Sequence, residues 1–78
     1  KLTVKARYAV TAMLDMVLRG NQSPVRVEDL SSRHHIPLAY LERLTGQLRS
    51  KGLLKSFRGP GGGYVLAKPS DCLTVGEI

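Results

Sequence analysis

The chain has 78 residues, of which 42% are hydrophobic and 23% charged, and its twelve Lys/Arg against six Asp/Glu give a formal net charge of +6 at pH 7. This composition excludes a disordered or low-complexity chain, and the length allows one small domain with a small core. The basic excess favours a polyanionic partner, either nucleic acid or an anionic membrane surface. The longest mainly apolar stretch, residues 8–14, is too short to span a bilayer and no small-residue cleavage site follows it, so we expect a cytoplasmic protein without a membrane partner.

The first predicted element is a helix that begins after Thr3 and ends before Gly20. Threonine is a good N-capping residue, and glycine is suited to the position just beyond a helix. Six apolar side chains fall on one broad face of this helix: Tyr8, Ala9, Ala12, Met13, Met16 and Val17. Residues 21–24 then form a turn. Two of the three residues 25–27 are valines, which are β-branched, so this segment predicts a short edge strand.

The middle of the chain predicts two helices separated by a tight break. Residues 28–34 form the first, with Glu28 and Asp29 in the turn where carboxylates suit the helix dipole. Pro37 ends it and starts a second helix over residues 38–51, which stops before Gly52. An apolar stripe along this second helix consists of Leu38, Leu41, Leu44 and Leu48. Two helices joined by about three residues are typical of a helix-turn-helix.

The face of the second helix opposite its leucine stripe is small and polar. It carries Ala39, Arg43, Gly46, Gln47 and Ser50, with Tyr40 and Glu42 on the flanks. Such a face fits a DNA major groove about 12 Å wide, and it is equally compatible with an ordinary solvent-exposed helix.

Residues 53–57 and 64–67 are short apolar segments that predict a β-hairpin, joined by the loop of residues 58–63, which we call the wing. The wing consists of Arg58, Gly59, Pro60, Gly61, Gly62 and Gly63. Chain reversal needs two residues, so five Gly/Pro positions indicate either a flexible loop or close approach to a ligand. The order of elements predicts a mainly α fold with a small β-hairpin, a winged helix-turn-helix over residues 1–73. A capping-box pattern from Thr74 to Glu77 predicts that a further helix starts over residues 74–78.

Catalytic and cofactor motifs find little support in this sequence. The dinucleotide-binding motif G-x-G-x-x-G is not matched, because Tyr64 occupies the position of its last glycine. The sequence also lacks the Gly-Lys pair of a Walker A phosphate-binding loop. His34 and His35 are neighbours whose side chains diverge by about 100°, so we expect solvated or capping residues rather than a metal site. The single cysteine, Cys72, excludes an internal disulfide. We therefore expect no enzyme.

Two binding functions remain after these exclusions. A winged helix either binds nucleic acid, with DNA favoured over RNA, or serves as a protein-interaction module. No acidic residue interrupts the basic stretch between Glu42 and Asp71, which favours DNA.

Several strings of this sequence resemble the bacterial Rrf2 family of transcription factors, and most closely its iron–sulfur cluster regulators. The resemblance covers essentially the whole chain and rests on the segments 2–3, 7–15, 40–42, 48–49, 51–53 and 58–64. Its most specific parts are the glycine-rich string 58–64 and the string 7–10 of the first helix. It implies a winged-helix domain that binds double-stranded DNA as a homodimer on a palindromic operator. Many members hold a [2Fe-2S] cluster in a cysteine-containing loop that would lie beyond Ile78. Cys72 matches no ligand position, so we expect no cofactor and no metal in this chain.

The resemblance also assigns roles to individual residues. Residues 38–51 become the recognition helix, where Tyr40, Glu42 and Arg43 match DNA-facing positions, although Ala39 and Arg43 replace a serine and a glutamine. Glu42 is suited to accept a hydrogen bond from cytosine N4. Arg58 would enter a minor groove while the wing glycines let backbone N–H groups approach phosphates. The predicted DNA contacts are Thr3, Lys5, Arg7, Ala39, Tyr40, Glu42, Arg43, Gln47, Arg49, Arg58, Gly59, Pro60, Gly61, Gly62 and Gly63.

Overall fold

The computed structural model describes residues 3–20 and 23–67. This part of the chain forms helices α1 (Val4–Leu18), α2 (Val27–His34) and α3 (Leu38–Ser50), followed by strands β1 (Leu54–Phe57) and β2 (Gly63–Leu66). The strands pair antiparallel, with Leu54 opposite Leu66 and Phe57 opposite Gly63. The architecture is the predicted winged helix-turn-helix. The predicted helix over residues 74–78, its capping box and Cys72 lie outside the described residues.

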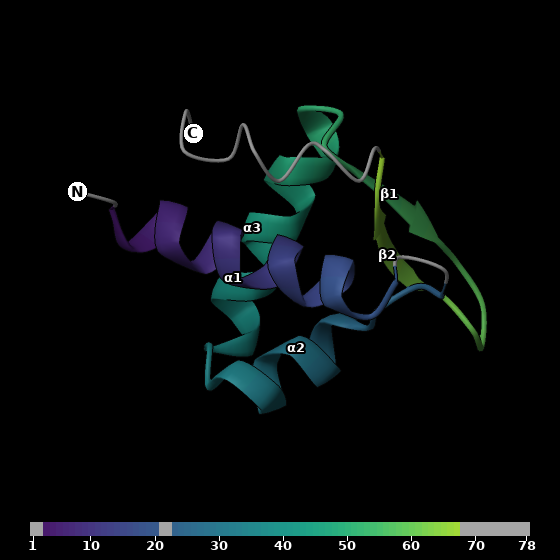
Figure 1. Cartoon of the computed structure of the whole chain (residues 1–78), viewed down its shortest axis with the longest axis horizontal. Coiled ribbons are helices and arrows are strands. Elements are labelled where there is room, and N and C mark those ends of the chain that lie inside the picture. Colours follow the sequence, from purple (N-terminus) through teal and green to yellow (C-terminus); the bar gives the residue numbers. More distant parts are fainter. Residues whose placement is uncertain (1–2, 21–22, 68–78) are drawn as a thin grey trace.

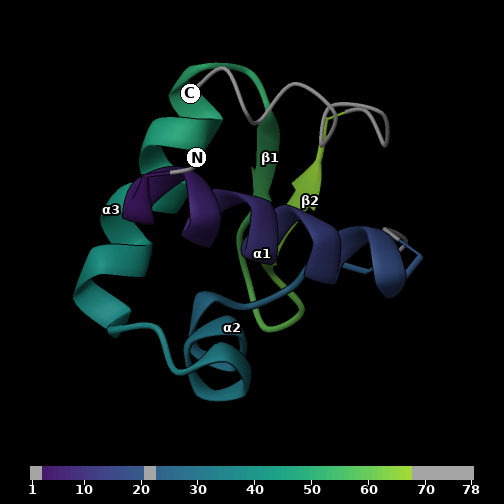
Figure 2. The same ribbon diagram turned by 60° about the vertical axis from the view of Figure 1, so that its left-hand side comes forward.

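The helices pack around one core, with the hairpin along one side of it. In Figure 1, α1 crosses in front of α3, α2 lies below α1, and the hairpin extends to the right of the helices. The turned view in Figure 2 shows α1 lying across both α3 and the hairpin, and α1 contacts both elements. None of the helices within residues 3–20 and 23–67 is long and apolar enough to cross a bilayer.

The predicted apolar faces account for most of this core. Thr3 caps α1 as expected, because its hydroxyl accepts a hydrogen bond from the Ala6 N–H at 3.0 Å. Leu30 of α2 and Leu54 of β1 are buried with these faces. The buried apolar side chains of α1 and α3 include Ala9, Ala12, Met13, Met16, Leu41, Leu44 and Leu48.

Two predictions about local structure need correction. Leu38 was predicted to belong to the apolar stripe of α3, but it lies in the first turn of the helix and is 39% exposed, while Ile36 in the break before α3 is buried. Residues 25–27 form no strand, because Arg26 is the N-cap of α2 and Val27 is already helical.

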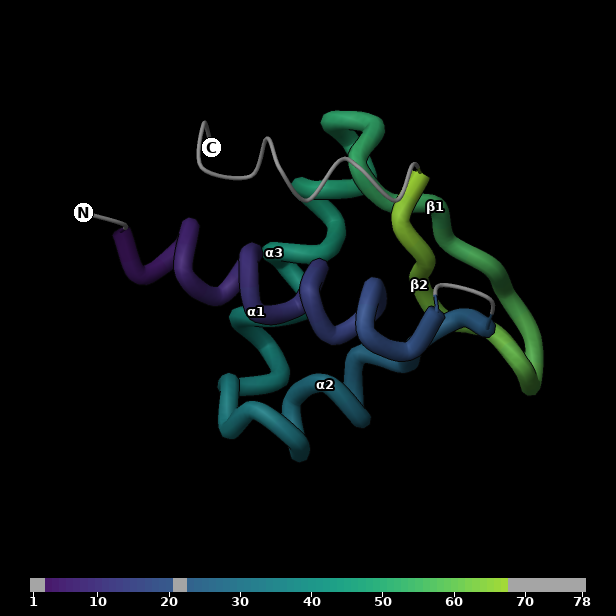
Figure 3. Tube along the Cα trace, in the orientation of Figure 1, coloured from purple at the N-terminus to yellow at the C-terminus, as the bar shows by residue number. Residues whose placement is uncertain are grey.

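Val25 still pairs with the hairpin through a single β-bridge to Tyr64. The Val25 N–H donates to the Tyr64 carbonyl at 2.8 Å, and the Tyr64 N–H donates to the Val25 carbonyl at 2.9 Å. Figure 3 shows the chain passing beside β2 on its way into α2. These two bonds join the helix-turn-helix to the base of the wing.

Candidate nucleic-acid interface

Helix α3 presents a polar face to solvent because its opposite face is fixed in the core. Leu41, Leu44 and Leu48 are buried, and Thr45 is buried beside them with its hydroxyl bonded to the Leu41 and Glu42 carbonyls. This packing leaves the predicted face open to solvent. Ala39, Arg43, Gln47 and Ser50 of that face are exposed and Gly46 is half-buried, and Glu42 on its flank and Arg49 are exposed as well.

Tyr40 lies at the edge of this face, where α3 meets α1. Its ring is half-buried and packs edge-on against Tyr8, with ring centroids 5.6 Å apart and an interplanar angle of 72°. Such pairs stabilise a fixed geometry. A hollow of about 170 Å³ beside this pair brings α1 and α3 together, and it is lined by Lys5, Tyr40, Arg43, Leu44 and Gln47. The structure therefore brings Lys5 beside three predicted DNA contacts of α3. Periodicity placed Tyr8 on the apolar face of α1, but its contact with Tyr40 was not predicted.

The wing continues directly from β1, and its residues differ in exposure. Arg58, Gly59, Pro60 and Gly61 are exposed. The Gly62 N–H donates to the Gly59 carbonyl at 2.9 Å, which closes a turn with Pro60 at its second position. The exposed wing backbone thus centres on residues 59–61.

Gly62 and Gly63 are required by internal packing at the end of the wing. A Cβ on Gly62 would collide with the Phe57 carbonyl oxygen. A Cβ on Gly63, whose φ is +149°, would lie 2.5 Å from the Val25 carbonyl oxygen. These two glycines are explained by close backbone approach whether or not they also contact DNA.

The cations of the domain fall into two groups. Arg19, Arg26, Arg33 and His34 each lie within 4 Å of a carboxylate. The remaining cations of the described residues have no carboxylate partner there, and five of them are predicted DNA contacts: Lys5, Arg7, Arg43, Arg49 and Arg58. Glu42 likewise has no cationic partner in this part of the chain. These five cations and Glu42 lie at the start of α1, on α3 and on the wing, whereas Lys51 and Lys55, which have no carboxylate partner among the described residues either, lie just after α3 and on β1.

Asp15 organises the first group, which we call the Asp15 cluster (Asp15, Arg19, Arg33 and His34). Its side chain is 5% exposed, and its two oxygens accept four hydrogen bonds. Arg19 Nε and Arg33 Nη2 donate to Oδ1 at 2.9 Å each, while Arg33 Nε and His34 Nε2 lie 3.1 and 2.7 Å from Oδ2. The cluster joins α1 to α2 and so holds the helix-turn-helix against the first helix.

The cluster also sets the ionisation of Asp15. Burial by itself raises the pKa of this carboxyl, but hydrogen bonds from Arg33, His34 and Arg19 and the charge of Arg33 outweigh burial and lower the pKa to about 2. The same bonds raise the pKa of Arg33. Asp15 is therefore ionised at neutral pH, and its role is structural.

The histidine prediction is half correct. His35 caps α2 in the left-handed conformation, at φ 55°, as a capping residue would. His34 is not solvated, because it is half-buried against Asp15, 19 residues earlier in the chain. The feature of the sequence that could have predicted this cluster is Asp15 itself, a carboxylate beside the apolar face of α1 that needs a cationic partner when it is buried.

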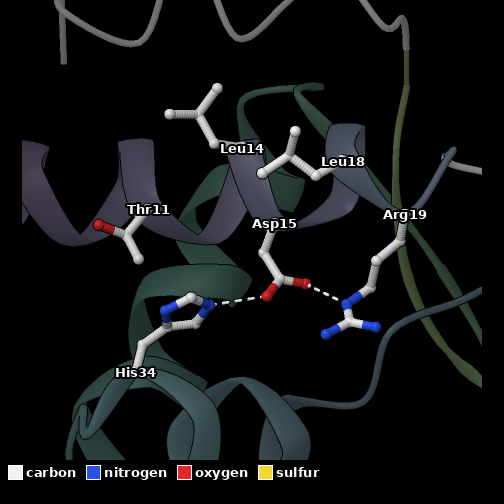
Figure 4. Close-up of a pocket in the computed structure, with 6 residues that line it drawn as sticks. All are labelled: Thr11, Leu14, Asp15, Leu18, Arg19 and His34. Atoms are coloured by element: carbon white, nitrogen blue, oxygen red, sulfur yellow. Dashed lines mark hydrogen bonds and ion pairs between the residues drawn. The ribbon is translucent and has the colours of Figure 1, made fainter.

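A shallow pocket of about 470 Å³ opens beside the Asp15 cluster. Figure 4 shows Leu14 and Leu18 above the Asp15 carboxylate, with Thr11, Arg19 and His34 around it. No group of three or more metal-ligating side chains occurs within residues 3–20 and 23–67. The residues present there do not fit an iron–sulfur cluster, which needs several thiolate or imidazole ligands.

Comparison with known proteins agrees with the fold. The model of the Rrf2 family, described as iron-dependent transcriptional regulators, matches residues 2–78. This chain belongs to the Rrf2 family. The HTH-type transcriptional regulator IscR of Erwinia tasmaniensis is 53% identical over all 78 residues, which cover 47% of that protein.

Two solved structures of Rrf2 regulators are also similar. CymR, the global cysteine regulator of B. subtilis, superposes with a TM-score of 0.83 at 32% identity, over 99% of this chain and 64% of CymR. IscR of T. potens gives a TM-score of 0.81 at 36% identity, over 96% of this chain and 59% of that protein. The chain thus spans about half the length of the curated IscR relative.

Proposed function

We propose that this Rrf2 chain is a sequence-specific DNA-binding domain of a transcriptional regulator. Helix α3 would lie in the major groove and the wing in an adjacent minor groove. We infer recognition rather than catalysis, because the family and the relatives that this chain matches are transcriptional regulators. In the full-length protein, two copies would bind a palindromic operator in the bacterial cytoplasm.

The observation that carries this proposal is the placement of the unpaired cations. Lys5 and Arg7 on α1, Arg43 and Arg49 on α3, and Arg58 on the wing lie in three elements that a winged helix turns toward DNA. Arg33, by contrast, is held by the buried Asp15 carboxylate. The unpaired cations are free to contact phosphates and base edges.

The other candidate is a protein-interaction module, and salt dependence separates the two. Binding to random duplex DNA, followed by fluorescence anisotropy, should weaken steeply with salt, with a log–log slope of about 0.9 per neutralised phosphate. Absent or salt-independent binding would favour the protein-docking function.

An iron–sulfur cluster belongs to this proposal only through the full-length protein. The chain has one cysteine, which cannot supply a ligand set alone. A [2Fe-2S] cluster would therefore require cysteines beyond Ile78, and DNA binding by this domain is proposed without it.

Glu42→Ala is expected to relax base preference while leaving or raising overall affinity. Glu42 is exposed on α3 and has no cationic partner among the described residues. A carboxylate facing DNA repels phosphates, yet it can select cytosine by accepting a hydrogen bond from N4. Selection from a random duplex library should show lost preference at one base pair per half-site. Unchanged preference at every position would exclude direct readout by Glu42.

A further inference from the structure

A small cleft separates the wing from the start of α2, and its residues come from both elements. Its volume is about 200 Å³. We call it the wing cleft, lined principally by Arg26, Glu28, Phe57, Gly59, Gly62 and Gly63.

Arg26 is only loosely held in this cleft. Its guanidinium Nε lies 3.6 Å from Glu28 Oε1, and both side chains are more than half exposed, at 55% and 57%. By contrast, Arg33 donates to Asp15 at 2.9 and 3.1 Å. A long, exposed ion pair contributes little free energy, so the Arg26 guanidinium can exchange its carboxylate for another anion.

The backbone position of Arg26 is fixed even though its side chain is not. The Arg26 carbonyl accepts hydrogen bonds from the Asp29 and Leu30 N–H groups at 3.1 Å each. Its neighbour Val25 is bonded to Tyr64 in β2. Arg26 therefore keeps a constant place beside the wing, and its side chain makes no capping bond to α2.

The chemistry of the cleft suits a phosphate more than any other group of DNA. A loop inserted into a minor groove about 6 Å wide has a sugar–phosphate strand on each flank. Gly59, Gly62 and Gly63 leave the wing wall of the cleft without side chains, so a backbone phosphate can come close. The first turn of α2 carries the carboxylates of Glu28 and Asp29, which repel a phosphate and offset the positive end of the helix dipole. The attraction for a phosphate must therefore come from the Arg26 guanidinium.

We propose that Arg26 binds a backbone phosphate of the strand flanking the wing, leaving Glu28 when DNA binds. This inference rests on the proposed function, because it needs the wing to lie on DNA. Since the contact reaches a phosphate, it adds affinity without adding sequence preference.

The test compares Arg26→Ala with wild type on a selected duplex and on a random duplex, across a salt series. We expect the magnitude of the log–log salt slope to fall by about 0.9, and affinity for both duplexes to fall by a similar factor, about tenfold. Glu28→Gln should strengthen binding to both duplexes, because it removes the competing carboxylate. Lys55→Ala is the matched control: it removes one positive charge from an exposed side chain of β1 that has no carboxylate partner among the described residues and is not a predicted DNA contact, so it should leave the slope unchanged.

The outcomes separate this inference from the function on which it rests. A steep slope for wild type together with no change in Arg26→Ala would overturn the role of Arg26 alone. An equal fall in slope for Arg26→Ala and Lys55→Ala would also overturn it, since net charge would then explain the effect. Absence of salt-dependent binding by wild type would remove the proposed function itself. Arg26→Gln, which preserves side-chain length, repeats the measurement if the alanine variant melts early.

Discussion

Asp15→Asn is expected to lower the free energy of unfolding by about 2 kcal/mol at pH 7. The pKa of Asp15 is about 2 in the folded domain against 3.8 for a free carboxyl, and each unit of difference corresponds to about 1.4 kcal/mol. Asparagine keeps the shape of the side chain but leaves Arg33, Arg19 and His34 without their anion. Urea denaturation followed by circular dichroism measures the loss, which is large for so small a domain.

Acid should remove this difference between the wild type and Asp15→Asn. Because the pKa of Asp15 is lowered on folding, the folded state binds fewer protons than the unfolded state between pH 4 and pH 2. The stabilisation is fully present above about pH 4 and is lost as pH falls toward 2. Asp29→Asn, at an exposed carboxylate of α2, serves as control and should change stability by about 0.5 kcal/mol or less. A gap between wild type and Asp15→Asn that stays constant down to pH 2 would mean that the Asp15 charge is not its source.

Arg58→Ala is expected to weaken binding to the specific operator by about 1 to 3 kcal/mol, or about fivefold to 150-fold. Arg58 is exposed at the end of β1 and has no carboxylate partner among the described residues. In a narrow A·T-rich minor groove, the negative potential favours a guanidinium, which is less strongly hydrated than an ammonium. Arg58→Lys should therefore recover only part of the affinity, as fluorescence-anisotropy titrations would measure.

Arg49→Ala provides the comparison for this prediction. Arg49 lies in the last turn of α3, and its predicted contact is a phosphate. Its loss should weaken binding to operator and random duplexes equally, whereas Arg58→Ala should affect the operator more. If operator affinity is unchanged in Arg58→Ala, the wing does not enter the minor groove.

Sequence periodicity predicted the elements of this fold because each one follows a local rule. The spacing of Leu41, Leu44 and Leu48 defines the buried side of α3, and Gly20 and Gly52 follow the helices with φ of 82° and 80°. The hairpin followed from two apolar segments around glycines, and β2 begins one residue earlier than predicted, at Gly63.

The features that the sequence did not predict depend on contacts between distant residues. His34 is hydrogen-bonded to Asp15, 19 residues earlier in the chain, and Tyr8 of α1 packs against Tyr40 of α3. Neither contact follows from spacing within one helix. Leu38 was predicted to belong to the leucine stripe of α3 and its spacing continues that stripe, but it is exposed because the core does not extend to the first turn of that helix. The predicted DNA contacts on α1, α3 and the wing stay predictions until tested on DNA.

The most direct test of the central claim is selection of duplexes from a random library by the wild-type domain, followed by titration of the enriched and scrambled duplexes. We predict one enriched motif and binding to it at least tenfold tighter than to the scrambled duplex, about 1.4 kcal/mol. No enriched motif and equal affinity for both duplexes would contradict sequence-specific DNA recognition by this domain.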